Sequence, residues 1–196
     1  PQGQGYVLNL GDSSSIDDFA TALKTDHDAP LILVNNAGIT HDNLAMRMKA
    51  AEWKAVINTN LNGVFHLTQT FIRGMMKAKF GRIINISSVV GRMGNPGQVN
   101  YAAAKSGLEG FTRALGAELA SRNITVNAIA PGFFKTGLTA SLYDDQKVIE
   151  ALAAQTIIGR NGELEDLNGL TIFLASRASD YITGQTISLD GGWTAK

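Results

Sequence analysis

Short apolar runs alternate along this chain with longer segments in which apolar and polar residues are mixed. A short, continuous apolar run is typical of a buried strand, and a longer segment rich in Ala, Leu, Glu and Lys is typical of a helix. We therefore expect strands near residues 6–10, 31–34, 81–86, 125–129 and 186–189. We expect helices near residues 15–24, 51–77, 98–121, 144–154 and 164–175.

This alternation of strands and helices predicts an α/β fold, a doubly wound parallel sheet with helices on both faces. The 196 residues of the chain are the length of a single domain, which we assign to residues 1–196. Ser15 and Asp18 have the spacing of a capping box, which predicts the start of the first helix.

The two long central helices carry small and apolar residues on more than one face. A helix of this kind needs burial on several faces. We therefore expect one face to pack on the sheet and another on a partner subunit. The residues in question are Gly63, Phe65 and Leu67 in the first helix and Ala102, Gly107, Phe111 and Ala114 in the second.

Composition narrows the possible functions. Lys and Arg (17) balance Asp and Glu (17), and no basic cluster is present, so we expect no nucleic-acid partner. The chain has no cysteine, which excludes disulfides and thiolate chemistry. No apolar run reaches about 18 residues, so we expect no membrane span. The three histidines (His27, His41 and His66) are scattered without metal-ligand spacing, so we expect no metal.

The sequence carries its clearest chemistry at Ser88, Tyr101 and Lys105. Tyr101 and Lys105 are four residues apart in an expected helix, so they lie one turn apart on one face. A cation beside a phenol favours phenolate, so we expect a tyrosine pKa lowered from about 10. Such a tyrosine can donate a proton to a ketone or accept one from an alcohol.

Ser88 follows the apolar run at residues 83–86. A hydroxyl at the carboxyl end of a buried parallel strand lies where open α/β sheets bind ligands. It could hydrogen-bond a substrate oxygen while charge develops there. A Tyr–Lys pair by itself is also common on helices whose tyrosine is merely packed, and the upstream serine is what favours catalysis.

Four sequence blocks, in order, resemble the short-chain dehydrogenase/reductase family and span nearly the whole chain. They are NNAG at residues 35–38, Asn60 within NTNL at 58–61, the Ser88/Tyr101/Lys105 set, and Pro131-Gly132 after an expected strand. Any one block is weak, and all four at family spacing are specific. The resemblance implies a Rossmann-like fold and an NAD(P)-dependent oxidoreductase.

Four longer stretches resemble the bacterial-type 3-oxoacyl-[acyl-carrier-protein] reductases of that family. They are residues 35–49, 81–97, 121–133 and 180–192. The resemblance implies a cytoplasmic homotetramer that uses NADPH to reduce 3-oxoacyl groups on acyl carrier protein in fatty-acid biosynthesis. Two alternatives remain open: a family reductase for acetoacetyl-CoA, a sugar acid or a small ketone, and a catalytically silent truncated subunit.

The resemblance also assigns roles to individual residues. It makes Tyr101 the general acid, with Lys105 lowering its pKa and holding the nicotinamide ribose. Ser88 would polarise the substrate carbonyl, and Asn60 would hold a water that relays protons from Lys105. Lys79 and Arg122 would dock the acidic carrier protein. The implied cofactor-binding residues are Asn9, Leu10, Asn36, Ala37, Gly38, Tyr101, Lys105, Pro131, Gly132, Phe134 and Thr136.

The chain departs from the family at its start. The family begins with a strand, a glycine-rich TGxxxGxG loop and a helix, and residues 1–12 already resemble its third strand. We therefore expect that an N-terminal βαβα portion of roughly 50 residues, which would hold the pyrophosphate, belongs to a longer protein. Smaller departures are Lys135 and Gly137, beside a lid at residues 138–147 expected to shape the acyl pocket, and Gln185 and Trp193 near the C-terminus.

Overall fold

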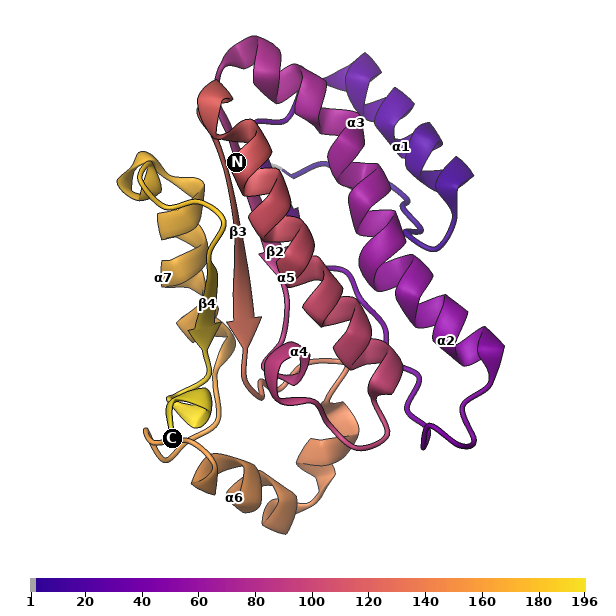
Figure 1. Ribbon diagram of the computed structural model, residues 1–196, viewed down its shortest axis with the longest axis vertical. Coiled ribbons are helices and arrows are strands. Elements are labelled where there is room, and N and C mark those ends of the chain that lie inside the picture. The colour runs from indigo at the N-terminus through magenta and orange to yellow at the C-terminus, as the bar shows by residue number, and fades with distance from the viewer. Residues whose placement is uncertain (1–2) are drawn as a thin grey trace.

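A parallel sheet of four strands organises the part of the chain that the structure, a computed structural model, describes: residues 3–196 (Figure 1). Pro1 and Gln2, part of the predicted third-strand segment, lie outside the described residues. The strand order follows the sequence, from β1 to β4. The strands are β1 (Ile32–Asn35), β2 (Gly81–Ile86), β3 (Ile124–Pro131) and β4 (Thr186–Leu189).

Helices cover both faces of this sheet, as the alternating pattern predicts. Successive strand residues point to opposite faces. Ile83 of β2 accordingly packs in a core with α3 (Gly63–Ala78) and α5 (Val99–Leu119), whereas Ile84 packs in a second core with α7 (Leu164–Ala175). Figure 1 shows α7 across the sheet from α3 and α5, with α1 (Ser13–Asp26) outside α3.

The predicted long helix at residues 51–77 is interrupted. It consists of α2 (Ala50–Ile57), a π-helical turn η1 (Asn58–Asn62) and then α3. The turn lies where Asn60 is fully buried and pairs with the backbone of Ile39. The remaining helices are the short α4 (Val90–Met93) and α6 (Gln146–Ala154), which Asp145 caps.

The predicted strand at residues 6–10 is wrong. No described strand lies beside this segment, so it has no ladder of hydrogen bonds to join, and Val7 is 90% exposed. Leu10 is nevertheless buried in the core with α3. The sequence pattern indicates which side chains point inward here, but a strand also needs an adjacent strand with which to form hydrogen bonds.

The predicted capping box is also wrong. Helix α1 begins earlier, at Ser13, because the Asp12 side chain accepts a hydrogen bond from the Ser14 N–H (3.0 Å). The Ser15 hydroxyl accepts instead from the Asn9 N–H (2.9 Å). Within the described residues, none of the helices is both long and apolar enough to cross a membrane.

Candidate active site

The candidate catalytic residues gather at the carboxyl ends of the strands, where parallel sheets bind ligands. Ser88 lies two residues after the end of β2, and the start of α5, with Tyr101 and Lys105, lies over this edge. In Figure 1 these strand ends point towards α4 and α6. The fold thus brings together segments that are separate in the sequence.

Tyr101 and Lys105 lie one turn apart on α5, and both are buried. Tyr101 is 9% exposed and Lys105 is 4% exposed. The Lys105 Nζ atom lies 5.5 Å from the centre of the Tyr101 ring. It donates a hydrogen bond to the carbonyl oxygen of Ile86, at the end of β2, over 2.6 Å. This bond ties α5 to the strand that leads to Ser88.

Burial controls the protonation of both groups. It lowers the pKa of Lys105 to about 8, because a buried ammonium loses its hydration. Burial also raises the pKa of the Tyr101 phenol, with a smaller rise from the charge of Asp42 and an opposing contribution from Ser88. The expectation that Lys105 lowers the tyrosine pKa is therefore not met in this structure, where desolvation of the phenol dominates.

Ser88 is half-buried at the turn from β2 into α4. Its hydroxyl oxygen accepts a hydrogen bond from the Val90 N–H over 3.2 Å. An oxygen that accepts this bond still has its own proton to donate. The Ser88 side chain can therefore donate to an incoming carbonyl oxygen.

Asn60 joins the loop after β1 to this site. Its side-chain oxygen accepts from the Ile39 N–H (2.9 Å), and its side-chain NH₂ donates to the Ile39 carbonyl (2.8 Å). A Cβ on Gly38 would lie 3.3 Å from the Asn60 Oδ1 atom and 3.7 Å from the Lys105 Nζ atom. Glycine at this position thus lets the loop backbone approach Lys105 closely.

The other expected cofactor residues fall into two groups. Near α1, Leu10 is buried and Asn9 is exposed, and Asn36 and Ala37 are exposed after β1. At the end of β3, the second group comprises Pro131, Gly132, Phe134 and Thr136, of which Phe134 is buried and Thr136 exposed.

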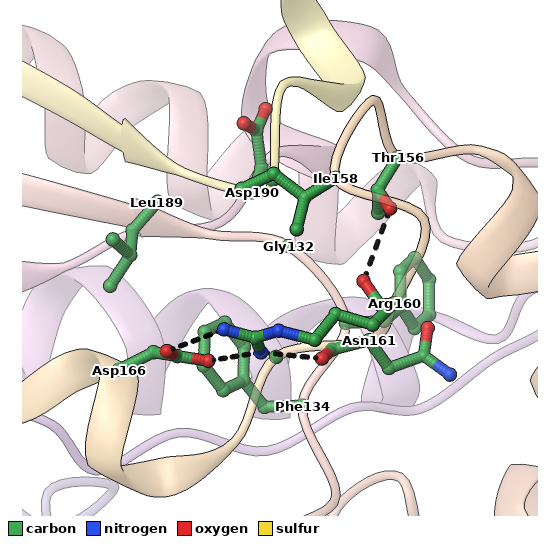
Figure 2. Close-up of a pocket in the computed structure, with 12 residues that line it drawn as sticks. Gly132, Phe134, Thr156, Ile158, Arg160, Asn161, Asp166, Leu189 and Asp190 are labelled. Atoms are coloured by element: carbon green, nitrogen blue, oxygen red, sulfur yellow. Dashed lines mark hydrogen bonds and ion pairs between the residues drawn. The ribbon is translucent and has the colours of Figure 1, made fainter.

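A cavity of about 140 Å³ opens beside the second group (Figure 2). Gly132 and Phe134 line it, and Arg160 lies across it in a two-pronged ion pair with Asp166 (2.7 and 2.9 Å). Ser88, Tyr101 and Lys105 are not among its lining residues. This cavity therefore lies beside the catalytic group rather than containing it.

The lid predicted at residues 138–147 contains the 3-10 turn η3 (Ala140–Asp144) and the start of α6. The Lys135 Nζ atom lies 5.9 Å from the centre of the Tyr143 ring, which joins the lid to the end of β3. Gly137 is exposed between them. No group of side chains among residues 3–196 has the composition to hold a metal ion.

Lys79 and Arg122 lie together at the opposite edge of the sheet. They precede β2 and β3, and the Asn123 side chain donates to the Lys79 carbonyl over 3.1 Å. The six residues of β2 separate this edge from Ser88 by about 20 Å. The proposed docking pair is thus remote from the catalytic residues of its own chain.

Asn100, a residue not predicted from the sequence, is fully buried immediately before Tyr101. Its side-chain oxygen accepts from the Tyr101 N–H (2.8 Å), and its NH₂ donates to the His41 carbonyl (3.0 Å). It therefore fastens the start of α5 to the loop after β1. An asparagine in the first turn of a helix was the available signal.

Lys105 is expected to make folding stability rise between pH 8 and pH 10. Its pKa is about 8 when folded, against an ordinary 10.5, so in this window the unfolded chain binds more protons and stability increases with pH. The gain is about 2 kcal/mol. Above pH 10 the raised pKa of Tyr101 acts in the opposite direction.

Urea unfolding of the wild type and of Lys105→Met at both pH values measures this contribution. The variant should lack the gain, because methionine fills a similar volume and does not titrate. An equal change of stability with pH in the two proteins would contradict the assignment.

Sequence and structure comparisons identify similar proteins. A family model described as enoyl-(acyl carrier protein) reductase matches residues 2–194. The 3-oxoacyl-[acyl-carrier-protein] reductase FabG of Pseudomonas aeruginosa is 52% identical over 191 residues, which are 97% of this chain and 76% of that protein. FabG of Haemophilus influenzae is 50% identical over 191 residues, 97% of this chain and 78% of that protein.

A solved structure is similar in fold. The gluconate 5-dehydrogenase of Burkholderia cenocepacia, in complex with NADP and tartrate, superposes with a TM-score of 0.91 at 36% sequence identity. The match covers 95% of this chain and 73% of that one.

Proposed function

Because the chain belongs to the short-chain dehydrogenase/reductase family, we propose that it reduces 3-oxoacyl-[acyl-carrier-protein] to 3-hydroxyacyl-[acyl-carrier-protein] in fatty-acid biosynthesis. Membership makes it an NAD(P)-dependent oxidoreductase. One observation supports this choice of substrate: two 3-oxoacyl-[acyl-carrier-protein] reductases are 52% and 50% identical to the chain over 97% of its length.

We propose NADPH as the cofactor, and the residues at the catalytic edge suit its nicotinamide end. Gly38, which has no side chain, lies close to the Asn60 side chain and the Lys105 ammonium, so its backbone is near both groups. Lys105 and Tyr101 would hold the ribose, and the loop of Pro131, Gly132, Phe134 and Thr136 would meet the nicotinamide. When bound, NADPH supplies the hydride for the reduction. The remainder of the NADPH molecule would be lined by Asn9, Leu10, Asn36, Ala37 and Gly38.

We assign the proton to the Tyr101 hydroxyl. Burial raises the pKa of this phenol, so it is protonated near neutral pH and can donate to the ketone oxygen. As the proton leaves, negative charge develops on the phenol oxygen. Lys105, when protonated, offsets this charge from the next turn of α5. The Ser88 hydroxyl would donate to the same ketone oxygen and polarise the carbonyl.

Asn60 has two parts in this proposal. The family resemblance gives it a water that relays protons from Lys105 to solvent. The hydrogen bonds to Ile39 support a second part, because they hold the loop that carries Gly38 against Lys105. The proton relay and the positioning of the loop are independent roles of Asn60.

The proposal includes a homotetramer in the cytoplasm and a carrier protein docked at Lys79 and Arg122. Three large apolar side chains support subunit packing, because they are more than 40% exposed on neighbouring helices. They are Trp53 of α2, Phe65 of α3 and Val99 of α5. The cytoplasmic assignment rests on the family resemblance alone.

Turnover of a short 3-oxoacyl-[acyl-carrier-protein], followed as NADPH oxidation, tests the proposed function. Oxidation that depends on both substrate and protein would support it. Inactivity beside a working relative, with the fold intact, would overturn it and favour a silent subunit. Activity confined to a sugar acid would favour the second candidate, which the similarity to a gluconate 5-dehydrogenase supports at 36% identity.

Reversing both charges of the docking pair (Lys79→Glu with Arg122→Glu) should lower kcat/KM for the carrier-linked substrate by about tenfold, or 1.4 kcal/mol of docking energy. Reduction of a free small ketone should not change, because both residues lie about 20 Å from Ser88. Steady-state kinetics on the two substrates measures the difference.

A matched control reverses two exposed cations on α1 and α3 (Lys24→Glu with Arg73→Glu), which changes the net charge equally. Equal losses in the two double variants would show that overall charge, and not the docking pair, attracts the carrier.

A further inference from the structure

A buried carboxylate on α5, Glu109, lies behind the segment that carries Ser88, and the proposed function does not use it. Its side chain is only 8% exposed. It lies one turn beyond Lys105 on the same helix. A buried carboxylate loses its hydration, which is costly unless partners compensate.

The first partner of Glu109 is Ser87, which immediately precedes Ser88. The Ser87 hydroxyl donates to the Glu109 Oε1 atom over 3.0 Å. The Ser87 N–H donates to the carbonyl of Ile129 in β3 (2.7 Å). Both the backbone and the side chain of this residue are therefore held.

The second partner is Arg92 of α4, four residues after Ser88. Its Nε atom lies 3.5 Å from the Glu109 Oε2 atom. The other guanidinium nitrogens donate to the Ser188 hydroxyl (3.0 Å) and the Thr186 carbonyl (2.8 Å) of β4. Arg92 thus joins α4 to both α5 and β4.

Helix α4 is also in direct contact with α5 between the Ser87 contact and the Arg92 contact. The Ser106 hydroxyl donates to the Gly91 carbonyl. A Cβ on Gly91 would lie 3.1 Å from the Cβ atom of Lys105. The segment from Ser87 to Arg92 is consequently fixed to the helix that carries Tyr101 and Lys105, and Ser88 lies within it.

We propose that Glu109 is a positioning residue: by holding Ser87 with one oxygen and Arg92 with the other, it fixes the Ser88 hydroxyl relative to Tyr101. The inference rests on the proposed function, which assigns Ser88 to the substrate carbonyl. Ser88, Tyr101 and Glu109 then move as one unit, because two of them share α5 and the third is fastened to it.

A purely structural ion pair would pin α4 to α5 with no consequence for Ser88. The two interpretations differ in how the effects of substitutions combine. If Glu109 acts through Ser88, its removal should do nothing further once the Ser88 hydroxyl is gone. If it acts on the fold alone, the two losses should multiply.

A double-mutant cycle of Glu109→Leu and Ser88→Ala tests this. Leucine fills a similar volume and removes both contacts. We expect kcat to fall about tenfold with KM little changed, since misplacing a reacting group costs up to about 100-fold. Glu109→Gln, which can still accept from Ser87, should recover most of the rate. In the Ser88→Ala background, Glu109→Leu should have no further effect, and multiplied losses would overturn the proposal.

The matched control is Glu118→Gln, which neutralises an exposed carboxylate on the same helix and should leave kcat unchanged. If Glu109→Leu does not fold, Arg92→Gln replaces it in the cycle; this variant removes the ion pair with Glu109 and also the Arg92 hydrogen bonds to β4. A rate loss shared by the Glu118 variant would contradict the assignment to Glu109.

An NMR measurement on protein with ¹³Cζ-labelled tyrosine does not depend on turnover. The Tyr101 resonance, assigned with Tyr101→Phe, should shift in Ser88→Ala and shift in the same direction in Glu109→Leu. A wild-type resonance in the Glu109 variant would overturn the proposal even if the chain reduces its substrate. The expected shift in a chain that does not turn over would preserve the positioning role and reject the proposed substrate.

Discussion

Replacing Tyr101 with phenylalanine is expected to lower kcat for reduction of the 3-oxoacyl substrate by about 10²- to 10⁴-fold, the range that general acid catalysis contributes. The substitution removes one oxygen atom and its proton from a ring that is 9% exposed. The ring itself stays in place, and the hydroxyl that is lost is a desolvated one, so we expect the fold to be retained. NADPH oxidation and thermal unfolding measure the two effects.

Tyr181 offers a matched control because its side chain is fully exposed. Tyr181→Phe makes the same chemical change away from the catalytic edge, and its kcat should equal that of the wild type. A near-wild-type rate for Tyr101→Phe would mean that another group supplies the proton. Loss of folding in the Tyr101 variant would assign that residue to the core, the interpretation that a lone Tyr–Lys pair leaves open.

The sequence predicts the bounds of three elements well. The strands at residues 81–86 and 186–189 and the helix at residues 164–175 are confirmed to the residue. In β2, Ile83 and Ile84 face opposite cores, which explains a continuous apolar run. Residues 6–10 fail because Leu10 is buried by α3 without any strand beside the segment.

Some features of the candidate site follow from local sequence, and others depend on residues distant in the sequence. Helical spacing alone predicts that Tyr101 and Lys105 are neighbours, and they are. The direction of the Lys105 ammonium depends on the Ile86 carbonyl, 19 residues earlier, which no local pattern specifies. The pKa of each group depends in turn on burial by the assembled fold. The chemistry of the site was therefore predictable only in part.

The positions of Lys79 and Arg122 relative to the predicted strands already indicate that these residues are distant from Ser88. Each stands two residues before a strand, and in a parallel sheet the strand starts share the edge opposite to Ser88. Their separation from the catalytic residues follows from that order alone. It also makes them useful experimentally, since substitutions there test the proposed carrier docking without touching Tyr101 or Lys105.

The largest expected loss of stability comes from Gly63→Ala, at the first residue of α3. A Cβ at this position would lie 2.1 Å from the Leu10 carbonyl oxygen and 2.9 Å from the Leu10 Cβ atom. Leu10 is part of the main core and cannot retreat without exposing apolar surface. We expect a loss of about 3 kcal/mol from this overpacking. The melting temperature should fall by about 10 °C.

The same substitution at Gly110 of α5 provides a control of opposite sign. A Cβ there would meet only the flexible end of Arg113, at 3.8 Å. Alanine should therefore stabilise the protein by about 0.5–1 kcal/mol, its advantage over glycine within a helix. Because Gly63 has ordinary helical dihedral angles, it should gain the same propensity, and only the collision with Leu10 separates the two. Equal stabilities of the two variants would show that the segment at residues 6–10 moves to accommodate the new methyl group, and that the proposed cofactor-binding residues Asn9 and Leu10 move with it.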